Sequence, residues 1–168
     1  MATAILSAER LREVLHYDPE TGAFTWKVRT SNRVSVGSAA GAMLKTGYLS
    51  ICIDSKFYRA HRLAWLYVHG EWPKADIDHL NGKRTDNRFC NLRDASRSKN
   101  QQNLRNARGE NTHSGLLGVH RTDKVHKQWR ASIKVDGKDK HLGNFSTKEA
   151  AHDAYLLAKR LHHEGCTI

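Results

Sequence analysis

The chain has 168 residues, of which 39% are hydrophobic and 8% aromatic, enough to build one ordinary domain or two small ones. This composition excludes disorder as a description of the whole chain. The 28 Lys and Arg against 17 Asp and Glu give a formal charge of +11 and a pI of about 9.8, which favours a polyanionic partner, nucleic acid before a membrane surface.

Three widely separated cysteines, Cys52, Cys90 and Cys166, form no CxxC pair, which argues against a zinc knuckle or a disulfide framework. We expect them to be reduced thiols in a cytosolic setting. No apolar run approaches the roughly 18 residues of a membrane span, and the N-terminus lacks a basic region followed by an apolar one. Neither a membrane span nor a signal peptide is therefore expected.

The first half of the chain predicts a helix, a small sheet and a second helix. Residues 7–18 place Leu11, Val14 and Leu15 at helical spacing behind the N-cap candidate Ser7. Short alternating runs then predict antiparallel strands over residues 23–29, 47–54 and 56–60. Residues 61–73 predict a helix with Leu63, Leu66 and Tyr67 on one face, stopped by Gly70 and Pro73.

The last third predicts three strands and a helix. The strands are expected over residues 116–121, 128–137 and 138–145, with a turn at Asp136 and Gly137 between the last two. Residues 146–165 predict a helix capped by Ser146 or Thr147. Its apolar stripe consists of Ala151, Ala154, Tyr155, Ala158 and Leu161.

Between these halves, residues 101–114 carry Leu104 as the only large apolar side chain and show no periodic apolar face, as expected of an exposed linker. We therefore predict an α+β chain in three parts: residues 1–104, a basic linker over residues 105–113, and residues 114–168. Each of the two larger parts combines a small sheet with helices.

The stretch "IDHLNGKRTDNRFCNLRDASRSKNQQN", from Ile77 to Asn103, concentrates the chemistry. Residues 83–108 hold eight basic and two acidic groups, a net charge of +6. Hydrolysis of a phosphodiester needs an activated water, a divalent cation and a correctly held base. Carboxylate and amide oxygens suit Mg²⁺ or Mn²⁺, and a neutral imidazole suits a general base, so Asp78, His79, Asn91 and Asn100 can supply these roles.

This stretch resembles the catalytic motif of the HNH endonucleases, the beta-beta-alpha-metal nucleases of phages and homing introns, and the resemblance extends over roughly residues 8–104. It implies that Asp78 and Asn100 hold one Mg²⁺ or Mn²⁺ ion, that His79 activates water and that Asn91 orients the imidazole. The third motif position is Asn rather than His here, a variation known in the family.

Residues 114–165 resemble the Apetala-two, or ethylene-response-factor, type of DNA-binding domain, through the matching elements "GV" before a basic residue, "WRASI", "LGNF" and "EAAHDAY". That resemblance implies a three-stranded sheet lying in the major groove of DNA, with a core of Leu142, Phe145, Ala151, Ala154 and Tyr155. The alternative for Trp129 is an ordinary position in the core. The alternative for each Lys is an exposed position that makes no contact with DNA.

Several polar residues have simpler interpretations. Asp86 and Asn87 favour an Asx-type turn that shapes the loop. His61 and His69 are expected to pack or cap their helix. His162, His163 and Cys166 lack a fourth partner for a metal.

We therefore predict a metal-dependent endonuclease acting on double-stranded DNA, of phage or homing type, that nicks or cuts both strands; a homodimer on DNA is left open. The rival hypotheses are a non-catalytic DNA-binding regulator and an RNA-directed nuclease. The residues expected to contact DNA are Arg84, Arg88, Arg93, Arg97, Lys99, Arg105, Arg108, Arg121, Trp129, Arg130 and Lys134, with Lys138 and Lys140 in reserve.

Overall fold

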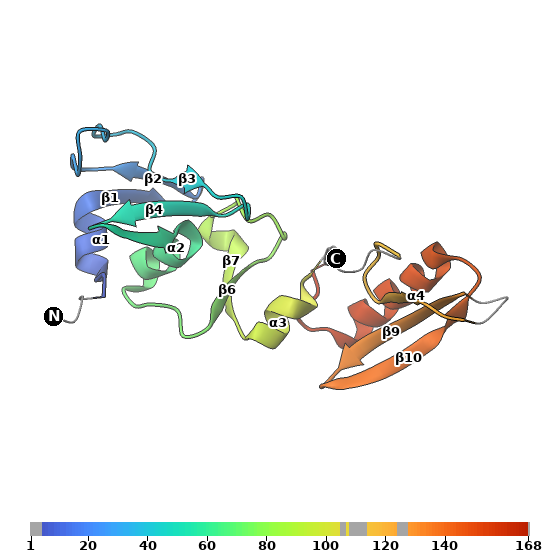
Figure 1. The fold of residues 1–168 in the computed structure, drawn as a ribbon. Coiled ribbons are helices and arrows are strands. Elements are labelled where there is room, and N and C mark those ends of the chain that lie inside the picture. Colours follow the sequence, from blue (N-terminus) through green and yellow to red (C-terminus); the bar gives the residue numbers. More distant parts are fainter. Residues whose placement is uncertain (1–4, 105–106, 108–113, 124–127, 168) are drawn as a thin grey trace. The chain divides into compact units, whose positions relative to one another are not determined.

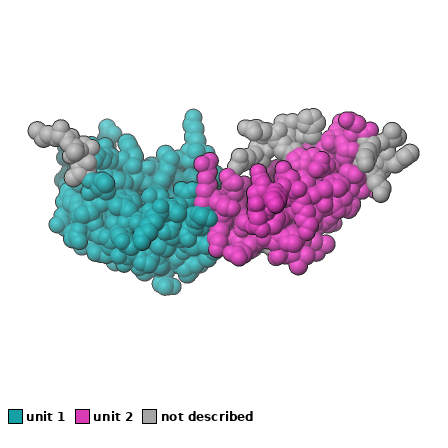
Figure 2. Space-filling view, turned by 90° about the horizontal axis from the view of Figure 1, so that it is seen from below, with its two compact units in different colours: residues 1–96 teal, residues 97–168 magenta. Residues whose placement is uncertain are grey.

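The computed structural model describes residues 5–104, 107, 114–123 and 128–167. The chain forms two compact units, residues 1–96 and residues 97–168 (Figure 2). Most of the expected linker, residues 105–106 and 108–113, lies outside the described residues. In the part of the chain that is described, no helix is long and apolar enough to cross a membrane.

The first unit combines two helices with three small antiparallel sheets (Figure 1). In chain order its elements are α1 (Ala8–Val14), β1 (Leu15–Asp18), β2 (Ala23–Trp26), β3 (Ala42–Met43), β4 (Leu49–Ile53), β5 (Lys56–Arg59), α2 (Ala60–His69), β6 (Asp76–His79), the 3-10 turn η1 (Phe89–Asn91) and β7 (Leu92–Ala95). The sheets are β1–β2, β3–β4–β5 and β6–β7.

The expected first helix ends earlier than its sequence pattern suggested. Ser7 caps α1 through its side chain, as predicted, but the chain turns extended at Leu15 and pairs with β2. The reason is that Leu15 and Tyr17 alternate with exposed residues, so both fill the core from a strand. Apolar residues two positions apart, such as Leu15 and Tyr17, occur in helices and in strands, so the sequence pattern alone did not distinguish the two. Packing in the core favours the strand.

Helix α2 agrees with its prediction and closes over the sheets. It ends at Gly70, which adopts the left-handed conformation with φ of 79° and donates its N–H to the Leu66 carbonyl. Leu63 and Leu66 are fully buried, together with Ile51 and Ile53 of β4. This core gives β6 a fixed surface to pack against, through Ile77.

The second unit is a three-stranded antiparallel sheet packed on one helix, with a short helix before it (Figure 1). Its elements are α3 (Arg97–Gln102), β8 (Val119–Arg121), β9 (Trp129–Val135), β10 (Lys138–Phe145) and α4 (Lys148–His162). The strand order is β10–β9–β8, and Thr147 caps α4. Three strands, a turn at Asp136 and Gly137, and one long helix were all expected.

Two side chains of this unit lie differently from their predictions. Leu161, expected on the apolar stripe of α4, is 80% exposed, because the helix extends beyond the edge of the core. Trp129, expected on the DNA face, packs against the cluster of Val119, Ala131 and Ala151. Alternation along β9 places Trp129 on the same face as Ala131, facing α4, and Arg130 on the other face.

Candidate active site

Asp78 and His79 end strand β6 and are both buried, with side chains held by the pairing of β6 with β7. Asp78 lies opposite Arg93 and His79 opposite Leu92 in the antiparallel ladder. Successive strand residues point to opposite faces, and Ile77 uses its side of β6 for the core. Ile77 and His79 therefore lie on one face of β6 and Asp78 on the other, so the carboxylate and the imidazole are consecutive at the end of the strand.

Asn91 ties down the chain that leaves His79. Its backbone carbonyl accepts the N–H of Leu80 at 2.9 Å, and its side-chain oxygen accepts the N–H of Asn81 at 2.9 Å. Its side-chain nitrogen donates to the Asp86 carbonyl at 2.8 Å. Both the oxygen and the nitrogen of this buried side-chain amide therefore bind backbone groups, so Asn91 fixes the loop that follows His79.

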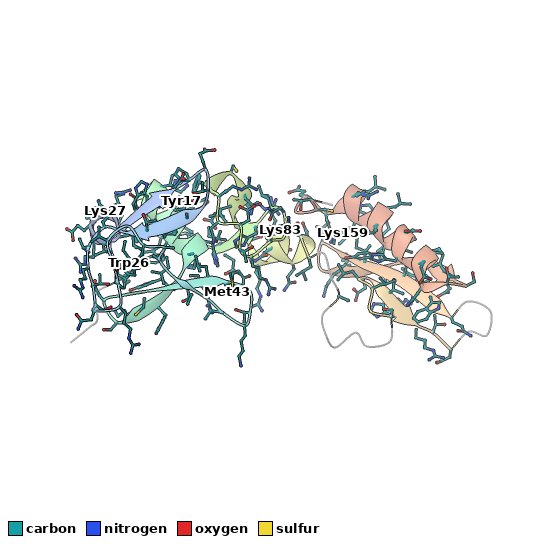
Figure 3. The ribbon with its side chains drawn as sticks, turned by 90° about the horizontal axis from the view of Figure 1, so that it is seen from above. Tyr17, Trp26, Lys27, Met43, Lys83 and Lys159 are labelled. Atoms are coloured by element: carbon teal, nitrogen blue, oxygen red, sulfur yellow. The ribbon has the colours of Figure 1, made fainter. Side chains whose placement is uncertain are left out.

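The amide that reaches the imidazole ring itself is Asn87. Its side-chain oxygen lies 3.4 Å from His79 Nε2, and its side-chain nitrogen donates to the Thr85 carbonyl at 3.3 Å. Asn87 is 2% exposed, and its backbone carbonyl accepts the hydroxyl of Tyr17 on β1 at 2.7 Å (Tyr17 is labelled in Figure 3). The contact expected of Asn91 with the ring is thus made by Asn87, which the sequence pattern had suggested only shapes the turn.

These contacts set the protonation of His79. Burial lowers the pKa of the imidazole below its ordinary value, with the Asn87 contact opposing this, so the ring is neutral at neutral pH. The amide oxygen of Asn87 is only an acceptor, so this contact favours the tautomer with the hydrogen on Nε2. A neutral imidazole held in this way has the chemistry that a general base needs.

Asp78 pairs with Arg93 across the hairpin. The guanidinium donates twice to Oδ2 of the carboxylate, from Nη2 at 2.8 Å and from Nε at 3.1 Å. This charge-assisted pairing orients the carboxylate and balances its charge in a buried setting. Arg93, expected to contact DNA, is therefore also a partner of the expected metal ligand, a role that only the strand register reveals.

His61 of α2 packs against His79, as expected of a packing residue. The two rings lie 5.1 Å apart, edge to face, and the Tyr48 ring lies 5.0 Å from His61. His61 is 7% exposed, and its Nδ1 is buried without a hydrogen-bond partner. Burial is the largest cause that lowers the pKa of His61, to about 3, so this ring is neutral in the folded protein.

Acid should destabilise the protein through His61. The pKa of His61 is about 6.5 in the unfolded chain and about 3 in the folded protein. Below pH 6.5 the unfolded chain therefore binds a proton at His61 that the folded protein does not, so the free energy of unfolding is highest above pH 6.5 and falls as the pH drops below that value. At pH 4.5 the loss is about 2–3 kcal/mol in the free energy of unfolding. In urea unfolding, His61→Phe should narrow the stability difference between pH 7.5 and pH 4.5 by that amount. An unchanged difference would show that His61 titrates normally.

The basic residues near the loop have partners within the protein. Arg84 donates to the Thr46 carbonyl at 2.8 Å and lies over the Tyr48 ring, 5.0 Å from its centroid. Arg88 pairs with Asp86 at 2.6 Å and holds the pKa of that carboxyl well below its usual range. These contacts shape the loop, and phosphate contacts of the same side chains stay a prediction.

The remaining predicted residues lie in the second unit or outside the description. Asn100 lies on α3 with Arg97 and Lys99, in the second unit, whereas Asp78 belongs to the first. Arg105 and Arg108 lie outside the described residues. Exposed Arg130 and Lys134 lie on β9, on the sheet face opposite α4. Arg121 lies on the edge strand β8, where it is the backbone ladder partner of Trp129.

An open hollow of about 350 Å³ lies beside Arg130 on that face, lined also by Thr122, His141 and Asn144. Its lining combines one guanidinium with an amide, an imidazole and a hydroxyl, groups that read base edges or phosphates. The outer face of the sheet is therefore the part of the second unit best suited to nucleic acid.

The donor chemistry fits a hard divalent cation better than zinc. Among the described residues no group of three or more His, Cys, Asp or Glu side chains is placed to hold a metal. The buried carboxylate of Asp78 is a hard oxygen ligand, as Mg²⁺ or Mn²⁺ prefers, and no thiolate lies on β6 or β7 beside it. Asn100 would have to add the second protein oxygen from α3.

Comparison with known proteins agrees with this site. A family model described as HNH endonuclease matches residues 58–102, from β5 to the end of α3. Protein 3.8 of Escherichia phage T7 is 30% identical over 111 residues, which cover 64% of this chain and 89% of the phage protein. Residues 58–102 form an HNH endonuclease domain, and the chain belongs to the same family as the phage protein 3.8. No solved structure matches it significantly.

The matched segment of this HNH chain contains the whole predicted motif, with Asp78, His79, Asn91 and Asn100. It also contains His61 and Asn87, two of the side chains that the structure places against His79. Tyr17, which holds Asn87 from β1, precedes the segment, and no pattern in the sequence marked it as part of the site.

Proposed function

We propose that this protein is a metal-dependent endonuclease that hydrolyses phosphodiester bonds of double-stranded DNA, in one strand or both. The observation that carries the proposal is the pair at the end of β6: a buried carboxylate next to a neutral imidazole whose Nε2 faces the Asn87 oxygen. Family membership supports a nuclease, and the charge of +11 supports a polyanionic substrate.

In this proposal His79 accepts, at Nδ1, the proton of a water molecule that attacks the phosphorus. The bond from phosphorus to one ester oxygen breaks, and that oxygen takes a proton from solvent as it leaves, while His79 later returns its proton to solvent. One strand end thus keeps the phosphate and the other becomes a hydroxyl. Asn87 holds the ring, and Asn91 holds the loop. Asp78 and Asn100 would bind Mg²⁺ or Mn²⁺, which supplies positive charge for the phosphate in the transition state.

The second unit is proposed to bind DNA through the outer face of β8–β10. Arg130 and Lys134 are its basic groups, with Arg121 at the edge. The fold of three antiparallel strands on one helix supports this assignment, as does the resemblance to Apetala-two type domains. Trp129 takes no part in it, since it packs toward α4.

A plasmid assay tests the proposal. The protein should convert supercoiled plasmid to nicked or linear DNA with Mg²⁺ or Mn²⁺, and EDTA should stop the conversion. A supercoiled plasmid that survives both metals would overturn the proposal, and binding without cleavage would favour the regulator instead. A matched RNA substrate, cut faster than DNA, would favour the RNA-directed nuclease.

A further inference from the structure

We propose that Arg59 and Arg84, held together on the ring of Tyr48, bind backbone phosphates of double-stranded DNA beside His79. This inference deepens the proposed function and rests on it for the choice of DNA as the polyanion. All four of these residues belong to the first unit. Neither Tyr48 nor Arg59 is among the residues that the sequence predicted to contact DNA.

Tyr48 connects the β3–β4 hairpin with the end of β6. Its carbonyl accepts the N–H of Leu44 at 2.9 Å, which closes the hairpin. Ile51 of β4 is fully buried in the core, and alternation along the strand therefore places Tyr48 on the opposite face. The centroid of its ring lies 5.0 Å from that of His61 and 5.9 Å from that of His79. Tyr48 is thus a neighbour of the proposed general base.

Two arginines from different segments, the arginine pair Arg59 and Arg84, lie over this ring. Cζ of Arg59, the last residue of β5, is 5.8 Å from the Tyr48 centroid, and Cζ of Arg84 is 5.0 Å from it. The ladder of β4 with β5 (Figure 1) places Arg59 opposite Ser50 and so on the face of Tyr48. Arg84 reaches this face from the loop after β6, where it donates to the Thr46 carbonyl at 2.8 Å. An aromatic face attracts guanidinium groups, so Tyr48 fixes the direction of both.

The charges of the arginine pair are not balanced by carboxylates. Among the residues that the structure describes, neither guanidinium forms an ion pair with Asp or Glu. The neighbouring arginines do: Arg88 pairs with Asp86. Arg93 likewise pairs with Asp78. Two positive charges beside one ring repel each other, and an anion close to both reduces that repulsion. The arginine pair is therefore prepared for an anionic ligand.

The chemistry of the arginine pair fits a phosphate. Arg84 is exposed and Arg59 half-buried, so a ligand can reach both from solvent. A guanidinium has five N–H donors in a fork that matches phosphate oxygens, and the bond of Arg84 to Thr46 uses one nitrogen. Residues 42–59 carry three basic groups and one acidic group, Asp54, which is paired with Arg10 at 2.9 Å.

The charge of Arg84 also acts on His79. Burial is the largest cause that lowers the pKa of His79, and the charge of Arg84 lowers it further. The ring contact through Tyr48 and this electrostatic effect both place the arginine pair next to the imidazole. A strand whose phosphates bind there passes the general base, and the first unit supplies these contacts by itself.

Variants of the full chain test this inference. Arg84→Met and Arg59→Met each remove one guanidinium and keep an unbranched side chain. Tyr48→Leu removes the ring that holds both, whereas Tyr48→Phe keeps the aromatic face. Arg12→Met is the matched control, because the Arg12 guanidinium on α1 also lies over a tyrosine ring, 5.6 Å from the centroid of Tyr67.

The first measurement is the affinity for a DNA duplex without metal, at several salt concentrations. Arg84→Met and Arg59→Met should each weaken binding about threefold to thirtyfold. Each should also make the slope of log affinity against log salt shallower by about 0.9, as expected when one phosphate contact is lost. Tyr48→Leu should weaken binding as much as either arginine variant. Tyr48→Phe and Arg12→Met should stay within about twofold of wild type.

The second measurement locates the bound phosphates by NMR of histidine side chains. A DNA duplex added without metal should shift the ring resonances of His79 in wild type. At equal saturation with DNA, this shift should be smaller in the double variant with Arg59→Met and Arg84→Met. The ring resonances of His16, which is exposed on β1, are the internal reference and should not move.

Unchanged affinity and salt slope in both arginine variants would overturn the phosphate contacts, and unmoved His79 resonances would overturn their location. Equal binding by folded Tyr48→Leu and wild type would overturn the role of the ring. If Tyr48→Leu unfolds the first unit, the arginine variants decide, because they change only solvent-accessible side chains.

Two further results separate this inference from the proposed function. Wild-type protein that shows these binding effects but leaves plasmid uncut refutes the proposed cleavage and leaves the phosphate contacts established. Tighter binding of an RNA duplex than of the DNA duplex, lost in the same arginine variants, would overturn the choice of DNA.

Discussion

His79→Ala is expected to lower kcat for plasmid cleavage by about 10²–10⁴, with little change in KM. The neutral imidazole of His79 is the base on β6 whose proton affinity best suits taking a proton from water at neutral pH, and we expect DNA binding not to depend on it. The effect falls on kcat because the proton moves only in the transition state. Initial rates over a range of plasmid concentrations measure it.

His16→Ala is the matched control, since His16 is an exposed histidine on β1 and takes no part in the site. Its kcat should equal that of wild type. If His79→Ala cleaves within about threefold of wild type, His79 is not the general base. Circular dichroism of both variants should show that the fold is kept.

Gly118→Ala is expected to unfold the second unit. Gly118 has φ of +70°, and a Cβ atom there would lie 1.9 Å from Cδ2 of the Tyr155 ring, inside the core between the sheet and α4. Strain and overpacking together should cost about 2–4 kcal/mol. A unit of this size has only about 3–5 kcal/mol to lose, so the second unit should be left marginally stable, with a substantial fraction of molecules unfolded there near 37 °C.

The measurement is thermal unfolding, together with DNA affinity at several salt concentrations. Gly115→Ala is a matched control, because Gly115 has φ of +68° but nothing within 4 Å of the added Cβ, so it carries the backbone strain alone. Gly118→Ala should also bind DNA more weakly and with a shallower salt slope, since Arg130 and Lys134 lose their sheet. Equal unfolding temperatures for the two variants would contradict the expected clash.

Much of the fold was predictable because local patterns dominate it. The strands of the second unit, their turn at Asp136 and Gly137 and the capped helix α4 follow from alternation, turn chemistry and helical spacing. The prediction was wrong where the same apolar pattern is compatible with both a helix and a strand. Leu15 fits a helix or a strand, and it became a strand because β2 was available to pair with it.

The candidate site was predictable in its chemistry but not in its contacts. The Asp78–His79 pair and the amides after it are visible along the chain, and the family match includes them. The sequence could not predict which amide contacts the imidazole ring, because Asn87 and Asn91 both follow His79 within one loop. The loop's path decides, with Asn91 bound to its backbone and Asn87 held under His79 by Tyr17.

The sequence by itself determined the α+β class, the basic character of the chain, and the carboxylate, imidazole and amides of the motif. Composition, periodicity and motif spacing are properties of neighbouring residues, and these can be read along a chain. Only the tertiary structure decided that Arg93 pairs with Asp78, that burial beside His79 lowers the pKa of His61, and that Lys159 of α4 donates to the Leu104 carbonyl. These contacts depend on strand register, burial and packing between segments distant in sequence, which no local pattern records.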